Sequence, residues 1–181
     1  PARAIDSYED ALMEDGDSLR AHERIVKAAR QTEDWSRVYR SCLELGRLVD
    51  DEETEADWLI EASDVARDEM WEPERALAGY RRAMELDPNR FDAFEAITQI
   101  LLEARDWEAL ELAYLKAIED HQKRDDAERE VLAVLWHKLG DLYHTHLEDI
   151  DGAATAYHRA SEIVPNNLEL HEKVAAICED R

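Results

Sequence analysis

Apolar residues recur along most of the chain at spacings of three and four positions, the period of an amphipathic α-helix. Polar segments that contain Pro or an Asp–Trp pair separate these stretches, as expected where helices end and begin. Gly and Pro number only 5 and 4, which excludes Gly-rich phosphate loops and most turn-dense β folds. We expect an all-α fold with helices over residues 3–14, 18–31, 34–46, 54–70, 73–86, 90–104, 106–121, 126–146, 150–163 and 168–179.

One stretch of the sequence is repeated. RALAGYRRAMELDPN at 75–89 returns as GAATAYHRASEIVPN at 152–166, and AIDSYEDALMEDG at 4–16 repeats part of the same pattern. The Ala–Tyr–Ala spacing places all three side chains on one helical face, where small residues let a neighbouring helix approach closely. The residues that keep their offsets over a shift of 77 positions are Ala76, Tyr80, Ala83 and Pro88, which match Ala153, Tyr157, Ala160 and Pro165.

The segment VLWHKLGDLYHTHLEDI at 134–150 predicts the partner helix of the last copy. Trp136, Leu139, Gly140 and Tyr143 share one face of this helix. A glycine in mid-helix costs about 1 kcal/mol relative to Ala. We therefore expect another helix to cross over Gly140.

These motifs resemble the tetratricopeptide repeat family, whose W-x2-L-G-x2-Y, A-x3-aromatic and Pro pattern stands here as W136HKLGDLY143, A153TAYHRA160 and Pro165. The resemblance implies a right-handed solenoid of antiparallel helical hairpins, a TPR-like α-α superhelix. Both ends fall inside a repeat, so we expect a fragment of a longer array. The expected units are a half repeat at 1–16, repeats at 17–50, 51–89, 90–124 and 125–166, and a half repeat at 167–181.

The resemblance also implies where a partner binds, because the first helices of the repeats line a concave face. Some family members hold a chaperone tail through a carboxylate clamp of Lys, Asn and Arg. The corresponding places here hold Glu23, Lys27, Ile60, Asp64, Glu95 and Gln99, so the clamp is not assembled and acids would repel such a ligand. The expected face comprises Arg20, Glu23, Lys27, Arg30, Asp57, Ile60, Asp64, Arg67, Asp92, Glu95, Gln99, Leu102, Val134, His137, Asp141 and His144.

The charge balance narrows the class of partner. The chain carries 45 Asp and Glu against 22 Lys and Arg, a net charge of −23. Binding to nucleic acids or to anionic membranes requires a basic surface, so we expect neither as a partner. The net charge also disfavours the direct RNA contact that a member of the half-a-repeat RNA-processing family would make. We expect a protein or peptide partner of basic or mixed charge, and a cytoplasmic protein without a cofactor.

Enzyme motifs are missing from the sequence: no G-x-S-x-G, Walker or H-E-x-x-H pattern occurs. We therefore expect no enzyme activity and no catalytic residues. His137, Asp141 and His144 share a helical face and form a weak candidate for a zinc site. The simpler interpretation, which we prefer, is a solvated polar face opposite the packed stripe that contains Trp136.

The tryptophans and cysteines have structural explanations. Asp34-Trp35 and Asp106-Trp107 are related by a shift of 72 positions, and the aspartates are expected to cap the helices that follow. Trp71 precedes Pro73 in a turn and is expected to be the most exposed tryptophan. Cys42 and Cys178 lack metal-binding spacing and are expected to be reduced, buried thiols.

The sequence thus favours a non-catalytic scaffold that binds a peptide segment or a helix of another protein on its concave face. One alternative is a regulatory or sensor segment of a larger multidomain enzyme. Another is a self-assembly module that associates through its uncapped ends.

Overall fold

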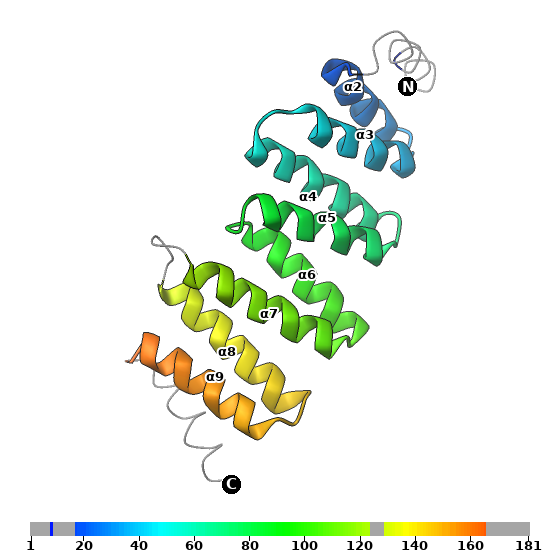
Figure 1. Cartoon of the computed structure of the whole chain (residues 1–181). Coiled ribbons are helices and arrows are strands. Elements are labelled where there is room, and N and C mark those ends of the chain that lie inside the picture. The colour runs from blue at the N-terminus through cyan, green and yellow to red at the C-terminus, as the bar shows by residue number, and fades with distance from the viewer. Residues whose placement is uncertain (1–7, 9–16, 124–128, 166–181) are drawn as a thin grey trace. The chain divides into compact units, whose positions relative to one another are not determined.

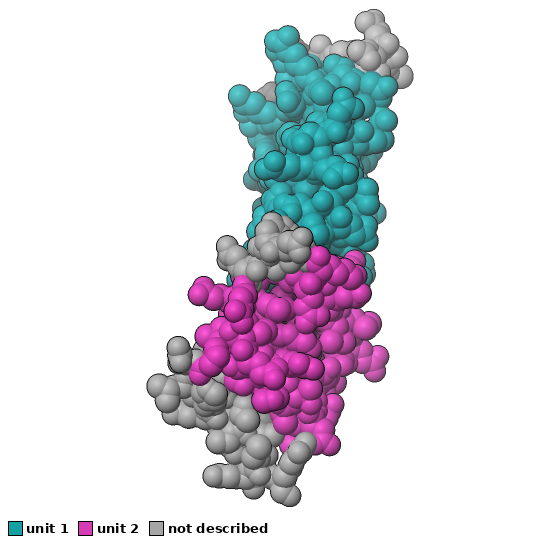
Figure 2. Space-filling model, turned by 60° about the vertical axis from the view of Figure 1, so that its left-hand side comes forward, with its two compact units in different colours: residues 1–100 teal, residues 101–181 magenta. Residues whose placement is uncertain are grey.

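The computed structural model describes residues 8, 17–123 and 129–165, which are helical apart from short turns and contain no strand (Figure 1). Within each unit, helices that follow one another pack side by side: those between residues 19 and 86 in the first unit, and those between residues 107 and 163 in the second. The chain divides into two compact units, residues 1–100 and 101–181 (Figure 2). In chain order the helices are α2 (Leu19–Arg30), α3 (Trp35–Leu48), α4 (Glu52–Asp68), α5 (Pro73–Leu86), α6 (Phe91–Ala104), α7 (Trp107–Gln122), α8 (Arg129–Thr145) and α9 (Ile150–Ile163).

The all-α prediction is confirmed, and the helices lie where the sequence pattern placed them. The predicted spans 73–86 and 150–163 coincide with α5 and α9, and the ends of α2, α3, α4, α6 and α7 lie within two residues of their predictions. The helix predicted at 126–146 corresponds to α8, although its first residues fall in a segment outside the described residues. The helix predicted at 168–179 falls outside the described residues, as does the one predicted at 3–14 apart from Tyr8, which is helical.

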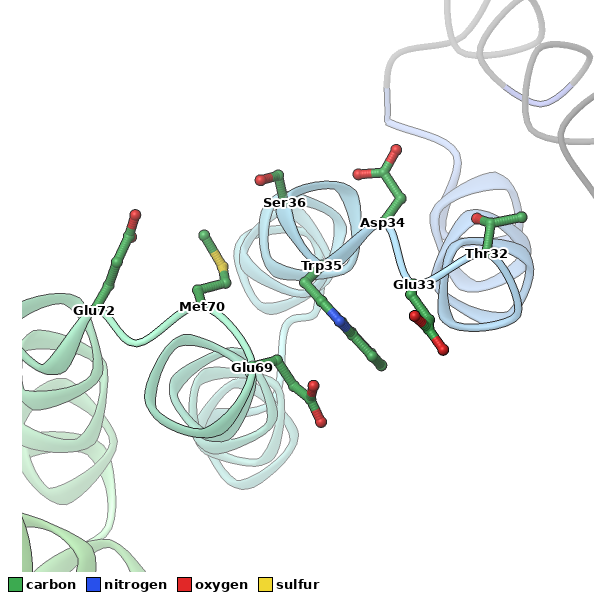
Figure 3. A pocket seen from close by; sticks show the side chains of 8 residues that line it. All are labelled: Thr32, Glu33, Asp34, Trp35, Ser36, Glu69, Met70 and Glu72. Carbon is green, nitrogen blue, oxygen red and sulfur yellow. The ribbon is translucent and has the colours of Figure 1, made fainter.

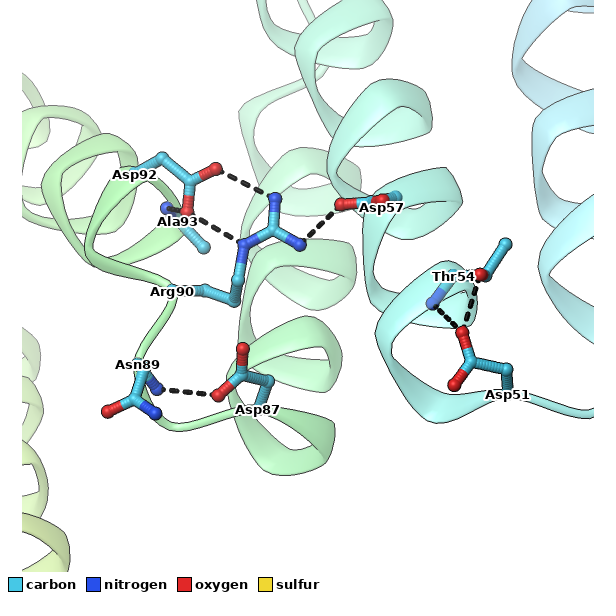
Figure 4. Close-up of polar contacts among 8 residues, drawn as sticks. All are labelled: Asp51, Thr54, Asp57, Asp87, Asn89, Arg90, Asp92 and Ala93. Atoms are coloured by element: carbon cyan, nitrogen blue, oxygen red, sulfur yellow. Dashed lines mark hydrogen bonds and ion pairs between the residues drawn. The ribbon is translucent and has the colours of Figure 1, made fainter. Parts of the chain in front are cut away.

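Aspartates cap four of the helices. The carboxylates of Asp34 and Asp106 accept hydrogen bonds from the backbone N–H of Arg37 at 3.2 Å and of Ala109 at 3.1 Å, as predicted. Asp51 caps α4 through the N–H of Thr54 at 2.9 Å (Figure 4), and Asp149 caps α9 in the same way. Each bond satisfies an N–H group that the first helical turn leaves without a partner.

The turn inside each helical hairpin contains one residue in the left-handed region. Glu33, Trp71, Arg105 and Glu148 have φ values of 55°, 58°, 55° and 52°. Each directly precedes the N-cap of the second helix, and none is glycine. This conformation costs a non-glycine residue about 1–2 kcal/mol. Helix packing on both sides of the turn therefore compensates for an unfavourable local geometry.

The small and aromatic residues of the repeated motif are buried in both units. Ala76 and Ala83 are fully buried and Tyr80 is 1% exposed, and the matching residues of α9 are buried in the same way. In α8, a Cβ atom built on Gly140 would lie 2.6 Å from two ring carbons of Tyr157. The prediction that a helix crosses over Gly140 is thus confirmed.

Candidate functional site

The first helices of the hairpins in residues 1–100 present polar side chains to solvent. On α2 and α6, the seven predicted residues that lie within this unit are all exposed. On α4, Asp57 is exposed, whereas Asp64 and Arg67 are half-buried. Ile60 is the exception, because it is only 8% exposed and packs into the core. The expectation that Ile60 lies open on this face is therefore wrong: its apolar side chain is removed from solvent.

Ion pairs join the first helices to one another across this face. Arg30 of α2 pairs with Glu61 of α4. Arg90, just before α6, places Nη1 2.6 Å from Oδ1 of Asp57 and Nη2 2.9 Å from Oδ2 of Asp92 (Figure 4). The hydrogen bonds from Arg90 lower the pKa of Asp92, and the Arg90 side chain is only 18% exposed. Sequence reasoning selected both aspartates but missed Arg90, the residue that holds them.

A buried tyrosine orients Asp64. Tyr80 Oη donates a hydrogen bond to Asp64 Oδ1 at 2.5 Å, and Arg67 Nη2 lies 3.3 Å from the same oxygen. The Arg67 guanidinium carbon also lies 5.7 Å from the centroid of the Tyr80 ring. Burial, followed by the bond to Asp64, raises the pKa of Tyr80 well above its usual range. Asp64 is thus held in one orientation by two neighbours.

The same arrangement occurs on α8 and α9. Tyr157 Oη donates to Asp141 Oδ1 at 2.8 Å, and His137 Nε2 lies 3.7 Å from that oxygen. The His137 and Tyr157 rings have centroids 5.7 Å apart and are tilted by 55°. Asp141 follows Asp64, and Tyr157 follows Tyr80, by the same 77 positions as the alanines. That shared shift was the sequence signal that could have revealed the Tyr–Asp pairs.

No family profile and no curated protein matches the sequence. Solved structures do match. The chain resembles the N-terminal domain of stress-induced protein-1 from C. elegans at a TM-score of 0.58 and 19% identity, over 71% of this chain and 98% of that one. The crystal structure of MamA protein matches at a TM-score of 0.52 and 18% identity, over 91% of this chain and 82% of that one.

A further match is the C-terminal part of a TPR repeat-containing protein from Cytophaga hutchinsonii, with a TM-score of 0.56 and 12% identity. The match covers 97% of this chain and 64% of that one. The W-x2-L-G-x2-Y and Ala–Tyr–Ala residues pack at the helix crossings that this fold requires. The chain has the tetratricopeptide repeat (TPR) fold.

In residues 101–181, the predicted TPR face is less charged. Leu102 and Val134 are 45% and 54% exposed, and His144 is exposed as well. His137 and Asp141 lie near one another as described above. Across residues 8, 17–123 and 129–165, no group of three or more His, Cys, Asp or Glu side chains is arranged to hold a metal ion. The side chains of this face can offer hydrogen bonds and apolar contact to a ligand.

The tryptophans of this TPR fold divide as predicted. Trp71 is 83% exposed, whereas the other four are half-buried against their helices. Trp107 at the start of α7 stacks on His146, the residue that directly follows α8, with ring centroids 4.0 Å apart and an interplanar angle of 9°. Trp107 thus joins two consecutive helices, α7 and α8.

Cys42 is fully buried in the core of residues 1–100, as predicted, and burial raises the pKa of its thiol to about 11. Cys178 lies outside the described residues. None of the helices in the described part combines the length and the apolarity that a bilayer-spanning segment requires.

Proposed function

We propose that this chain is a non-catalytic scaffold that binds a peptide segment or a helix of another protein through the first helices of its TPR hairpins. The observation that carries the proposal is the set of side-chain contacts that order the polar face of α2, α4 and α6 in residues 1–100. Arg30–Glu61 and Asp57–Arg90–Asp92 link neighbouring first helices, and Tyr80 holds Asp64. A face already ordered in this way loses little side-chain entropy when a ligand binds.

The charges of this face favour a ligand of basic or mixed charge. On α2 the predicted residues carry three positive charges and one negative, whereas α4 and α6 are dominated by carboxylates. An extended segment that crosses from one helix to the next therefore meets fields of opposite sign. Complementary charges on the ligand would give it a preferred direction on the face.

The test uses variants that leave these contacts intact. Glu23 and Glu95 are exposed on α2 and α6, and neither takes part in the ion pairs described above. Glu23→Lys/Glu95→Lys changes the net charge of the chain by the same amount as the control Asp50→Lys/Glu148→Lys, whose residues are exposed in the α3–α4 and α8–α9 connections and are not among the predicted face residues. Thermal melting of each variant checks that the fold is retained.

A library of random dodecapeptides is selected on the wild-type chain, and the enriched peptides are titrated by calorimetry. We expect enriched peptides whose affinity falls at least tenfold in Glu23→Lys/Glu95→Lys and is kept in the control. Equal affinities in both variants would refute binding on this face. If light scattering instead showed mass rising with concentration and no peptide was enriched, self-assembly would replace ligand binding.

A further inference from the structure

The hairpin turns of residues 1–100 enclose a depression that lies apart from the first-helix contacts described above. It has a volume of about 570 Å³ and is lined by the α2–α3 turn on one side and the α4–α5 turn on the other. Figure 3 shows the indole of Trp35 extending into the space between the side chains of Glu33 and Glu69. Two carboxylates thus flank one aromatic ring.

These carboxylates differ from their neighbours in the same depression. Asp34 Oδ2 lies 2.6 Å from Nη1 of Arg37, and Glu72 Oε2 lies 2.6 Å from Nη1 of Arg75. Glu33 and Glu69 are exposed, and within the described residues the carboxylate of neither has a hydrogen-bond or ion-pair partner. Trp35 packs partly against the core that contains Val38 and Cys42, so its ring is anchored.

The corresponding turns of residues 101–181 show what such a ring accepts. The shift of 72 positions carries Glu33 and Trp35 onto Arg105 and Trp107, and the shift of 77 carries Glu69 onto His146. There the imidazole of His146 stacks on Trp107 nearly in parallel, with ring centroids 4.0 Å apart. In residues 1–100 the position of that imidazole belongs to Glu69, and no ring or cation of the described residues stacks on Trp35. In the turns of residues 101–181, the tryptophan thus stacks on a planar nitrogen-containing group. In the corresponding turns of residues 1–100, the Trp35 ring has no such group from the described residues stacked on it.

We propose that this depression binds the guanidinium of an arginine from a basic segment of a partner protein, stacked on Trp35 between the carboxylates of Glu33 and Glu69. A guanidinium is planar, keeps its charge at all relevant pH values and stacks on indole. It also donates paired hydrogen bonds to carboxylates, which a lysine ammonium cannot do in the same geometry. The net charge of −23 adds a long-range attraction for a basic segment. This surface is independent of the first-helix face, so either proposal can fail alone.

The test follows the indole N–H signal of Trp35 by ¹⁵N–¹H NMR on the full chain, assigned through Trp35→Phe. Three capped ten-residue peptides of alternating Gly and Arg, Gly and Lys, or Gly and citrulline are titrated. Citrulline keeps the shape of arginine without its charge. Glu33→Lys/Glu69→Lys is compared with Asp50→Lys/Glu148→Lys, because Glu148 occupies the same left-handed turn position as Glu33. Glu33→Gln/Glu69→Gln serves as a second, milder variant, and circular dichroism verifies the fold of each.

We expect the arginine peptide to shift the Trp35 signal, the lysine peptide to bind at least threefold more weakly, and the citrulline peptide to leave the signal in place. Glu33→Lys/Glu69→Lys should lower the affinity for the arginine peptide at least tenfold, and Glu33→Gln/Glu69→Gln should lower it less. The control Asp50→Lys/Glu148→Lys should change this affinity by less than twofold. Equal weakening in the control would show general charge attraction and overturn the proposal. An unmoved Trp35 signal at saturation, or equal binding of the citrulline peptide, would do the same.

Discussion

Two helix-interior glycines should respond to the same substitution with opposite signs. Replacing Gly with Ala in a helix removes backbone freedom from the unfolded chain and gains about 1 kcal/mol when there is room for the methyl group. At Gly46 in α3 a new Cβ would lie 3.5 Å from Cβ of Trp58 and 3.6 Å from the carbonyl oxygen of Glu55, which are ordinary contacts. We expect Gly46→Ala to raise the free energy of unfolding by about 0.5–1 kcal/mol.

Gly140→Ala meets the Tyr157 ring instead. The new Cβ would lie 2.6 Å from two ring carbons, whereas carbon atoms pack at about 3.5–4.0 Å, so the ring must withdraw by about 1 Å. Tyr157 is 2% exposed and its hydroxyl is bonded to Asp141 at 2.8 Å, which leaves little space for that movement. Overpacking costs about 1–3 kcal/mol, and a clash with a ring that has so little room places this case in the upper part of that range, at about 2–3 kcal/mol. After the helix gain is subtracted, we expect Gly140→Ala to destabilise the chain by about 1–2 kcal/mol.

The assay is urea unfolding followed by far-UV circular dichroism at pH 7, with midpoint and slope fitted for each variant. A double-mutant cycle with Tyr157→Leu identifies the ring as the cause, because Gly140→Ala should be nearly harmless once the ring is gone. A Gly140→Ala chain as stable as wild type would refute the helix crossing described here. A similar loss for Gly46→Ala would show that the effect is general to helix glycines.

Three further results are expected. Tyr80→Phe removes the hydroxyl bonded to Asp64 and should cost about 1–2 kcal/mol, while Tyr80→Ala should cost about 3–5 kcal/mol; unchanged thermal melting in either variant would contradict the packing of Tyr80. Arg105→Gly removes the cost of placing a side chain in the left-handed region, so it should raise the free energy of unfolding in urea by about 0.5–1 kcal/mol. Arg105→Ala keeps a Cβ atom at this position and should give no gain. Burial in the folded chain raises the pKa of the Cys42 thiol from 9.0 to about 11, so the folded state favours the protonated thiol. The free energy of unfolding should therefore fall as the pH rises between those two values. The fall should be smaller in Cys42→Ala. An equal pH dependence in both chains would show that Cys42 contributes nothing.

The sequence by itself determined the helices and much of their packing. Their apolar period placed most helix ends within two residues, and the Ala–Tyr–Ala spacing identified buried faces that the structure confirms. Asp34 and Asp106 were recognisable as caps because a cap bond joins residues only three positions apart. Gly140 signalled a helix crossing because a mid-helix glycine has a local cost that something must offset.

Only the tertiary structure showed what the polar residues do. The sequence placed Asp64 and Asp141 on an open face, yet each accepts a hydrogen bond from a tyrosine 16 positions away. We expect a change of either aspartate to Lys to lower stability, because it removes the acceptor of a buried hydroxyl. Arg90 pairs with Asp57 over 33 positions, a contact that no helical period encodes.

The same division applies to the turns and to the depression beside Trp35. Four left-handed residues without a single glycine among them cannot be anticipated from local preference, because helix packing on both sides imposes the conformation. The depression forms where two turns 38 positions apart are brought together by the packing of α3 against α4. Local periodicity and capping act over three or four residues and can be deduced from the chain, whereas polar pairing and surface shape depend on which helices meet.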